Sequence, residues 1–116
     1  MKIYEYAGCS TCKKALKFLD QKKIEYKKIA IVEQPPSLAE LKKMLVYYDG
    51  QINKLFNTSG LVYREMGLSE KLKTMTETQA LKLLSKNGKL VKRPFVLTAT
   101  SGRVGFKEDE WKKLIL

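Results

Sequence analysis

Near the start of the chain stands Tyr6-Ala7-Gly8-Cys9-Ser10-Thr11-Cys12-Lys13-Lys14. It follows an apolar run, Ile3 to Tyr6, that predicts a β-strand. Apolar residues at helical spacing come after it and continue to about Lys22, so a helix is predicted there. The two cysteines, the only ones in the chain, therefore lie where a strand passes into a helix.

A C-x-x-C motif at such a junction is typical of redox proteins, because the first sulfur meets the unpaired N–H groups and positive dipole end of the helix. Both favour the thiolate, the form that attacks a disulfide or an electrophilic oxyanion. We predict that Cys9 is an exposed nucleophile with a lowered pKa. Cys12 should lie on the apolar face of the helix, in reach to resolve the adduct. The alternative is a pair of small buried apolar residues, which the polar turn around Cys9 disfavours.

Metal binding and membrane insertion are both disfavoured by the composition. The chain has no histidine and no second cysteine pair, so a zinc site would need carboxylates or another subunit, and we expect no metal. The first residues lack the long uncharged apolar stretch of a signal peptide or a transmembrane helix. We expect a cytoplasmic protein that does not act at a membrane, and in a reducing compartment a close cysteine pair is seldom a permanent bridge.

The net charge of +11, from 23 basic and 12 acidic residues, favours anionic partners such as nucleic acid, acidic proteins or a small oxyanion. Only Arg64, Arg93 and Arg103 are arginines, and lysines occur in every segment. Scattered lysines are typical of a solubilising surface rather than of a nucleic-acid groove. We therefore expect no direct contact with nucleic acid.

After the first helix, a second extended run over residues 24–32 closes a β-α-β unit whose two strands should be parallel and adjacent. A helical insert of about residues 37–88 follows. Capping boxes predict two helix starts in it and turn residues predict two helix ends: the starts are at Ser37 with Glu40 and at Thr76 with Gln79, and the ends are at Asp49-Gly50 and at Gly88.

Residues 95–98 and 103–106 read as an antiparallel hairpin, and a final short helix carries Trp111. The order strand-helix-strand, helical insert, hairpin and helix predicts an α/β protein with a thioredoxin-like fold and a mixed sheet. We expect one domain, residues 1–116, because nothing in the chain resembles a linker and its length suits a single core.

Arg93-Pro94 is the second candidate constellation. The residue before a proline is restricted to extended geometry, so Arg93 should project from a fixed backbone and suit a planar or tetrahedral oxyanion. An ordinary surface arginine beside a strand-starting proline is an equally good interpretation of these two residues alone. The sequence is compatible with either isomer of the Arg93-Pro94 bond.

The chain resembles, essentially from end to end, the family that unites glutaredoxin-coupled arsenate reductases with Spx-type transcription regulators. The resemblance rests on these segments: Cys9-Ser10-Thr11-Cys12, Glu33-Gln34-Pro35-Pro36-Ser37, Tyr63-Arg64-Glu65-Met66-Gly67-Leu68, Lys92-Arg93-Pro94 and Val104-Gly105-Phe106-Lys107-Glu108-Asp109-Glu110. It implies a thioredoxin-like fold with a helical insert. It also implies that Cys9 is the nucleophile and that Arg93 holds an oxyanion.

The resemblance further implies a set of substrate-contacting positions: Ser10, Thr11, Lys13, Pro94, Asn57 and Lys107. At the last two, the arsenate enzymes carry arginines. An amide and a lysine grip a compact oxyanion less well than bidentate guanidinium groups do. Gly50 matches a glycine with which Spx docks RNA polymerase, although Asp49-Gly50 is equally an ordinary turn.

Two hypotheses follow. The first is a cytoplasmic, arsenate-reductase-like thiol-disulfide redox protein in which Cys9 attacks a small oxyanion or thiol substrate and Cys12 resolves the product. It needs no bound cofactor, and glutathione with glutaredoxin, or thioredoxin, would restore the thiols. The second is a redox-sensing regulator of the Spx type that binds the RNA polymerase alpha subunit and uses a Cys9-Cys12 disulfide as its switch.

Overall fold

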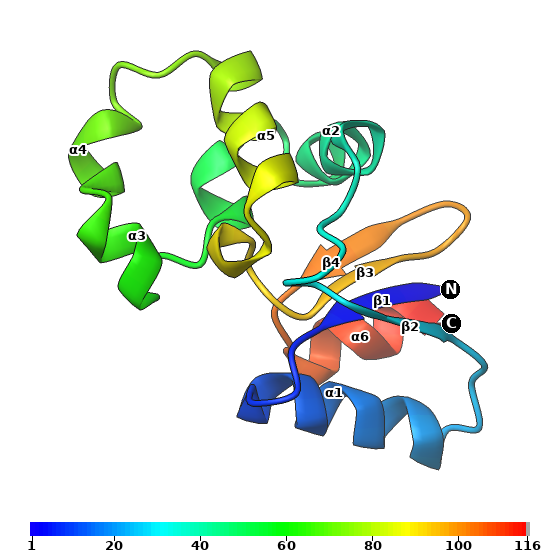
Figure 1. Ribbon diagram of the computed structural model, residues 1–116. Helices are drawn as coiled ribbons and strands as arrows, with labels where there is room; N and C mark the ends of the chain where they lie inside the picture. Colours follow the sequence, from blue (N-terminus) through cyan, green and yellow to red (C-terminus); the bar gives the residue numbers. More distant parts are fainter. Residues whose placement is uncertain (116) are drawn as a thin grey trace.

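The computed structural model describes residues 1–115. Its elements, in chain order, are β1 (Lys2–Glu5), α1 (Ser10–Gln21), β2 (Lys27–Ala30), α2 (Leu38–Tyr47), η1 (Ile52–Leu55), α3 (Leu61–Glu65), α4 (Leu68–Lys71), α5 (Glu77–Lys86), η2 (Gly88–Leu90), β3 (Phe95–Leu97), β4 (Gly102–Val104) and α6 (Glu108–Ile115). Figure 1 shows that the elements between β2 and β3 form the predicted helical insert.

The four strands form one mixed sheet in the order β2-β1-β3-β4. β1 pairs with β2 in parallel, and it pairs with β3 antiparallel, so that Tyr4 lies opposite Ile29 on one side and Phe95 on the other. β3 and β4 are the predicted antiparallel hairpin. Both the parallel β-α-β unit and the mixed sheet are confirmed.

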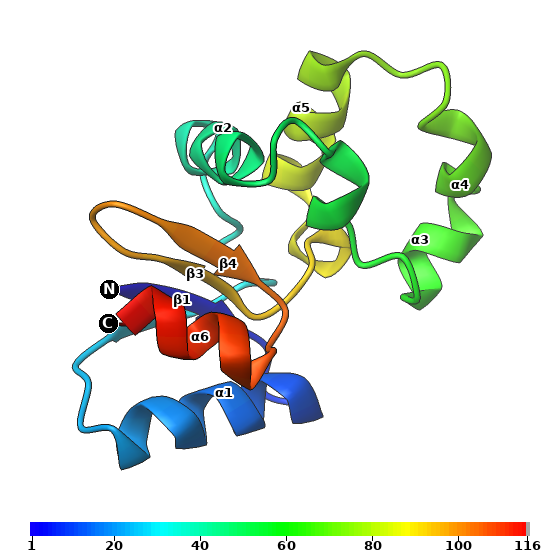
Figure 2. The same cartoon turned by 180° about the vertical axis from the view of Figure 1, so that it is seen from behind.

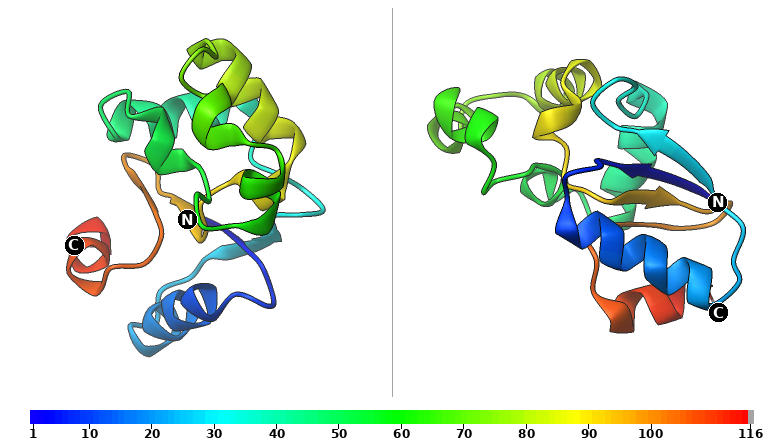
Figure 3. Two further views of the ribbon diagram at one scale, coloured as in Figure 1. Left: turned by 90° about the vertical axis from the view of Figure 1, so that its left-hand side faces the viewer. Right: turned by 60° about the horizontal axis from the view of Figure 1, so that its bottom comes forward.

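Helices cover both faces of the sheet. α1 and α6 lie on one face, and the helical insert lies on the other, with α3 and α4 farthest from the strands (Figures 1 and 2). The views in Figure 3 show the same three-layer arrangement from the side and from below. This mixed four-stranded sheet between layers of helices is the predicted thioredoxin-like fold.

Alternation along the strands divides the core into two clusters. Ile3 and Val96 point toward α1 and α6, where they pack with Phe18 and Trp111. Tyr4 and its neighbours Phe95 and Leu97 point the other way and join the larger cluster with the insert. Because successive strand side chains face opposite sides of the sheet, each of these short strands contributes residues to both core clusters.

Two helices of the insert begin with the predicted capping boxes. The Ser37 hydroxyl accepts a hydrogen bond from the Glu40 N–H at 3.1 Å, and the Glu40 carboxylate accepts one from the Ser37 N–H at 3.0 Å. Thr76 and Gln79 exchange the same pair of bonds at the start of α5. Both helix starts are confirmed.

The Glu40 carboxylate also joins the insert to the sheet. It accepts a hydrogen bond from the Tyr4 hydroxyl at 2.6 Å and pairs with the Lys2 ammonium at 3.1 Å. Partial burial opposes ionisation of Glu40, but the bonds from Tyr4, Ser37 and Lys2 outweigh it and lower the pKa of the carboxyl. This half-buried group ties the start of α2 to β1.

The second strand is shorter than predicted, and Gly88 has a structural role that the sequence did not predict. The second strand covers only Lys27–Ala30 rather than residues 24–32, because the chain turns directly after it and Ile31 is buried in the insert cluster. α5 ends at Lys86, just before Gly88 as predicted, and Gly88 itself begins η2. A Cβ at Gly88 would lie 1.9 Å from the carbonyl oxygen of Ile31, so close backbone contact is what requires glycine there.

Asp49 and Gly50, in contrast, follow the end of α2 with positive φ angles of 55° and 78°, as expected of a helix-terminating turn. Within residues 1–115, no helix combines the length and the apolar character needed to cross a membrane.

Candidate redox site

Cys9 and Cys12 occupy different environments although they lie in one turn of chain. Cys9 is the N-cap of α1, and its sulfur accepts a hydrogen bond from the Cys12 N–H at 3.3 Å. Cys9 is half-buried, whereas Cys12 is 0% exposed and packs on the inner side of α1. Both are free thiols. The predicted difference in exposure is confirmed.

The two thiols also differ in acidity. Partial burial is the largest influence on Cys9 and opposes ionisation. Hydrogen bonds from the thiol and the N–H of Cys12, followed by hydrogen bonding and charge from Arg93, outweigh burial and lower the pKa of Cys9. Burial, reinforced by the hydrogen bond to Cys9, raises the pKa of Cys12 to about 12. Cys9 is therefore the more acidic thiol and the candidate nucleophile, and Cys12 is its protonated partner at neutral pH.

Arg93 approaches Cys9 from the start of β3. The Arg93-Pro94 peptide bond is cis, Pro94 is buried, and its carbonyl accepts a hydrogen bond from the Gly105 N–H at 2.9 Å. The guanidinium carbon of Arg93 lies 4.8 Å from the centre of the Tyr6 ring, which belongs to the turn before Cys9. The tertiary structure thus brings Arg93-Pro94 next to the turn that contains Cys9.

A cavity of about 200 Å³ opens beside Arg93. Its lining mixes cationic, amide and apolar groups and consists of Tyr6, Asn57, Gly60, Leu61, Val62, Lys89 and Arg93. Leu61 is 63% exposed, which is unusual for a leucine and leaves an apolar face at the mouth of this cavity. The cavity can therefore accept an anion that carries apolar atoms.

Asn57, a predicted substrate contact, lies in this cavity with Arg93. Its backbone N–H donates to the Leu90 carbonyl at 2.7 Å, and its own carbonyl accepts from the Gly60 N–H at 3.0 Å. A Cβ at Gly60 would lie 2.7 Å from the Asn57 amide nitrogen, so the amide is held against the start of α3.

Pro94 lies next to Arg93, and the remaining predicted contacts fall in two further places. Ser10, Thr11 and Lys13 form the first turn of α1, next to Cys9, with Ser10 and Lys13 exposed. Lys107 does not line the Arg93 cavity but a separate one of about 450 Å³, together with Lys54 and Lys92. Contact between Lys107 and a substrate at Cys9 stays a prediction.

Gly50, the predicted partner contact, lies in the insert. It is exposed and shares a cavity of about 370 Å³ between α2 and α5 with Val46, which is 73% exposed. The structure does not bring Gly50 together with the cysteines or Arg93 in this cavity.

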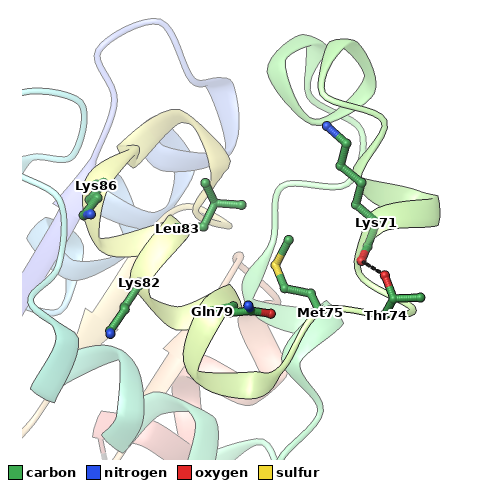
Figure 4. A pocket seen from close by; sticks show the side chains of 7 residues that line it. All are labelled: Lys71, Thr74, Met75, Gln79, Lys82, Leu83 and Lys86. Atoms are coloured by element: carbon green, nitrogen blue, oxygen red, sulfur yellow. Dashed lines mark hydrogen bonds between the residues drawn. The ribbon is translucent and has the colours of Figure 1, made fainter.

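A larger cavity, of about 550 Å³, is lined by residues of the insert alone (Figure 4). It lies between α4 and α5 and is lined by Lys71, Thr74, Met75, Gln79, Lys82, Leu83 and Lys86. This lining contains no thiol and no carboxylate. Size alone would favour it over the Arg93 cavity, but the perturbed thiols and Arg93 place the candidate site at the start of α1.

Within the part of the chain that the structure describes, no three or more side chains of the kinds that bind metals gather in one place.

Sequence reasoning missed Tyr6 and Leu61 as lining residues of the Arg93 cavity. Tyr6 was visible next to the cysteine motif, but only the path of the chain reveals which way its ring turns. Leu61 carried no distinguishing signal.

Comparison with known proteins adds the family. The ArsC family model matches residues 4–114. The chain belongs to the ArsC family. An ArsC family related protein from Bacteroides fragilis has 49% sequence identity, covers 97% of this chain and 95% of its own, and has a TM-score of 0.91.

Relatives of two kinds resemble this ArsC family member. A structure named a possible arsenate reductase, from Streptococcus mutans UA159, is 32% identical with a TM-score of 0.87 and covers 96% of each chain. The global transcriptional regulator Spx of Listeria innocua is 26% identical and covers 97% of this chain and 85% of its own length. The fold and family predicted from sequence are confirmed.

Proposed function

We propose that this ArsC family member is a cytoplasmic thiol-disulfide redox protein of the arsenate-reductase-like class. One observation carries the proposal: two thiols in one helical turn have opposite acidities, with Cys9 half-buried and lowered in pKa and Cys12 fully buried and raised in pKa to about 12. Thiol-disulfide exchange requires a reactive thiolate, here Cys9, and a second thiol that resolves the mixed disulfide, here Cys12.

In the proposed exchange, the Cys9 thiolate attacks one sulfur of a disulfide, forms a mixed disulfide and releases the other half as a thiolate. Cys12 then gives up its proton and attacks the Cys9 sulfur. A Cys9-Cys12 disulfide forms and the second half of the substrate leaves as a thiol. Two protein thiols have supplied two electrons, and glutathione with glutaredoxin, or thioredoxin, returns them. No bound cofactor takes part.

Arsenate is the oxyanion substrate to test. Its reduction to arsenite takes two electrons from two thiols and releases one oxygen as water. In this proposal Arg93, which acts on Cys9, holds the anion. Asn57 lines the same cavity, and an amide offers a weaker grip than a guanidinium. We therefore expect organic disulfides to react faster than arsenate.

The test compares the wild-type protein with Cys9→Ser and Cys12→Ser in both reactions, with glutathione and glutaredoxin or with thioredoxin as the source of electrons. Turnover of either substrate that needs Cys9 supports the proposal. A wild-type protein that consumes neither a disulfide nor arsenate faster than Cys9→Ser contradicts it. Mass spectrometry of the oxidised protein identifies the Cys9-Cys12 bond.

A second candidate is a redox-sensing regulator of the Spx type. Its support is the exposed turn at Gly50, whose φ is 78°, beside the largely exposed Val46 on the outer side of the insert. In this proposal the surface docks the RNA polymerase alpha subunit, and oxidation of Cys9 and Cys12 switches the affinity.

Binding of purified alpha subunit, measured with oxidised and with reduced protein, tests the regulator. Gly50→Arg should abolish binding. Gly67→Arg is a matched control, because Gly67 is also exposed, also has a positive φ, and also has no atom within 4 Å of the point that a Cβ would occupy. Absence of binding in both redox states removes this candidate.

A further inference from the structure

Tyr6 is an exposed aromatic residue whose ring is held in place from two sides. A Cβ at Gly8 would lie 3.1 Å from a ring carbon of Tyr6, so the ring folds back over the turn that leads to Cys9. The guanidinium carbon of Arg93 lies 4.8 Å from the centre of the same ring. Tyr6 is therefore the side chain that spans the distance between the nucleophile's turn and the arginine.

Apart from its hydrogen bond with Cys9, Arg93 has little else to fix its position. Neither of the two ion pairs within residues 1–115 involves Arg93. A guanidinium that stacks on an aromatic face keeps its N–H groups at the edges, where they remain free for hydrogen bonds to a carboxylate or another oxyanion. The ring thus orients the plane of the guanidinium without competing for its donors.

The same ring also shapes what can enter. Tyr6 and the exposed Leu61 both line the 200 Å³ cavity, with Asn57 and Arg93 among its polar groups. A compact inorganic oxyanion uses only the polar groups. An organic anion fills the space between the ring and the leucine and also reaches Arg93.

We propose that Tyr6 is a positioning and specificity-determining residue, which holds Arg93 beside Cys9 and selects disulfides in which a carboxylate is attached to an apolar or aromatic body. The inference rests on the proposed function, since it assigns a role within thiol-disulfide exchange at Cys9. The bonds formed and broken are those of that exchange, and Tyr6 enters only through the placement of Arg93 and the wall of the cavity.

The test uses two aromatic disulfides that differ in charge, the dianionic dithiobis-nitrobenzoate and the uncharged dithiodipyridine. The quantity measured is the ratio of their rate constants with Cys9, which cancels differences in the intrinsic reactivity of the thiolate. We expect Tyr6→Leu to lower this ratio about two- to fivefold, the range that a cation–π contact supplies. Tyr6→Phe, which keeps the ring, should restore it.

The coupling between Tyr6 and Arg93 gives a second readout. Arg93→Ala should lower the same ratio, and adding Tyr6→Leu to Arg93→Ala should lower it no further, because the ring then has no cation to hold. Tyr26→Leu is the control for loss of a tyrosine ring, since Tyr26 bonds to Asp20 at the far end of α1 and should leave the ratio unchanged.

The outcomes separate the two proposals. A wild-type protein in which Cys9 reacts with neither disulfide faster than free cysteine contradicts the proposed function. A reactive wild-type protein whose ratio is the same in Tyr6→Leu, or falls equally in Tyr6→Phe, overturns the role of Tyr6 alone. Strictly additive effects of Tyr6→Leu and Arg93→Ala would also overturn it.

Discussion

The starts of α1 and α2 are built from the same kind of backbone but are closed by different side chains. At α2 the Ser37 oxygen and the Glu40 carboxylate satisfy each other's N–H groups, and an acidic residue lies in the first turn. At α1 the cap is the Cys9 sulfur, and the first turn contains no acidic residue. α5 repeats the α2 arrangement with Thr76 and Gln79.

The difference separates a structural helix start from a reactive one. A capping box uses the exposed N–H groups and the dipole to stabilise the helix. A neutral thiol is a weak acceptor, so the start of α1 is left under-satisfied until the sulfur becomes a thiolate. The free N–H groups and the dipole of α1 therefore stabilise the Cys9 thiolate rather than the helix with a neutral cap.

The sharpest way to break this comparison is Cys9→Ser, which gives α1 a cap like that of α2. We expect disulfide exchange to fall by a factor of at least about 1,000, because the nucleophile is gone. At a pH below the pKa of Cys9, stability should be retained or rise by about 0.5–1 kcal/mol, because a hydroxyl caps better than a neutral thiol. Exchange kinetics and urea unfolding measure the two effects, and a destabilised Cys9→Ser would contradict the interpretation of the cap.

The pH dependence of unfolding distinguishes Cys12 from Cys9. Folding raises the pKa of Cys12 from about 8.5 to about 12. The contribution of Cys12 is fully present below pH 8.5 and is lost as pH rises toward 12, because the unfolded chain loses its proton first. The loss should reach at most about 1.4 kcal/mol for each pH unit in that window.

Cys12→Ala should flatten this alkaline slope relative to the wild type, as urea unfolding between about pH 8 and pH 11 would measure. Cys9→Ala should leave this alkaline slope nearly unchanged and alter the pH dependence below pH 8.5 instead. The lowered pKa of Cys9 adds stability that is present above pH 8.5 and is lost as pH falls through the folded-state pKa. A Cys12→Ala slope equal to that of the wild type would contradict the acidity assigned to Cys12.

Arg93→Ala sharpens the comparison by removing the cation that acts on the Cys9 cap of α1. Hydrogen bonds from Cys12 contribute more than Arg93 to lowering the pKa of Cys9, so we expect a moderate effect. The midpoint of Cys9 alkylation should rise, with a rate at pH 7 that is about three- to tenfold lower. Arg64→Ala, on the exposed side of α3, is the matched control. An unchanged midpoint would mean that Arg93 does not act on Cys9.

The smallest effect is expected at the structural helix start. Ser37→Ala removes the hydroxyl that accepts from the Glu40 N–H and should cost about 1 kcal/mol of unfolding free energy. Exchange at Cys9 should not change, because α2 shares no hydrogen bond with the cysteines. Denaturant midpoints and exchange rates, measured on the same preparation, check both parts. A drop in exchange rate would mean that the two helix starts are coupled.

Features that depend on a few consecutive residues were predictable. The capping boxes at Ser37 and Thr76, the hairpin of β3 and β4, and the exposure difference between Cys9 and Cys12 all follow from local spacing. The length of β2 and the reason for Gly88 were not predictable, because both depend on where Ile31 and the end of α5 meet in space.

The candidate site divides in the same way. The sequence of one helical turn by itself determines that the Cys9 sulfur meets the unpaired N–H groups of α1 and that Cys12 faces the core. The reason is geometric, because the first N–H groups of a helix have no partner and side chains three residues apart lie on a defined face. Only the folded molecule decided that Arg93 acts on that sulfur, that Tyr6 and Asn57 line the cavity beside Arg93, and that Lys107 lines another cavity. Strand pairing and core packing join segments more than eighty residues apart, and no short-range pattern records which way their side chains then turn.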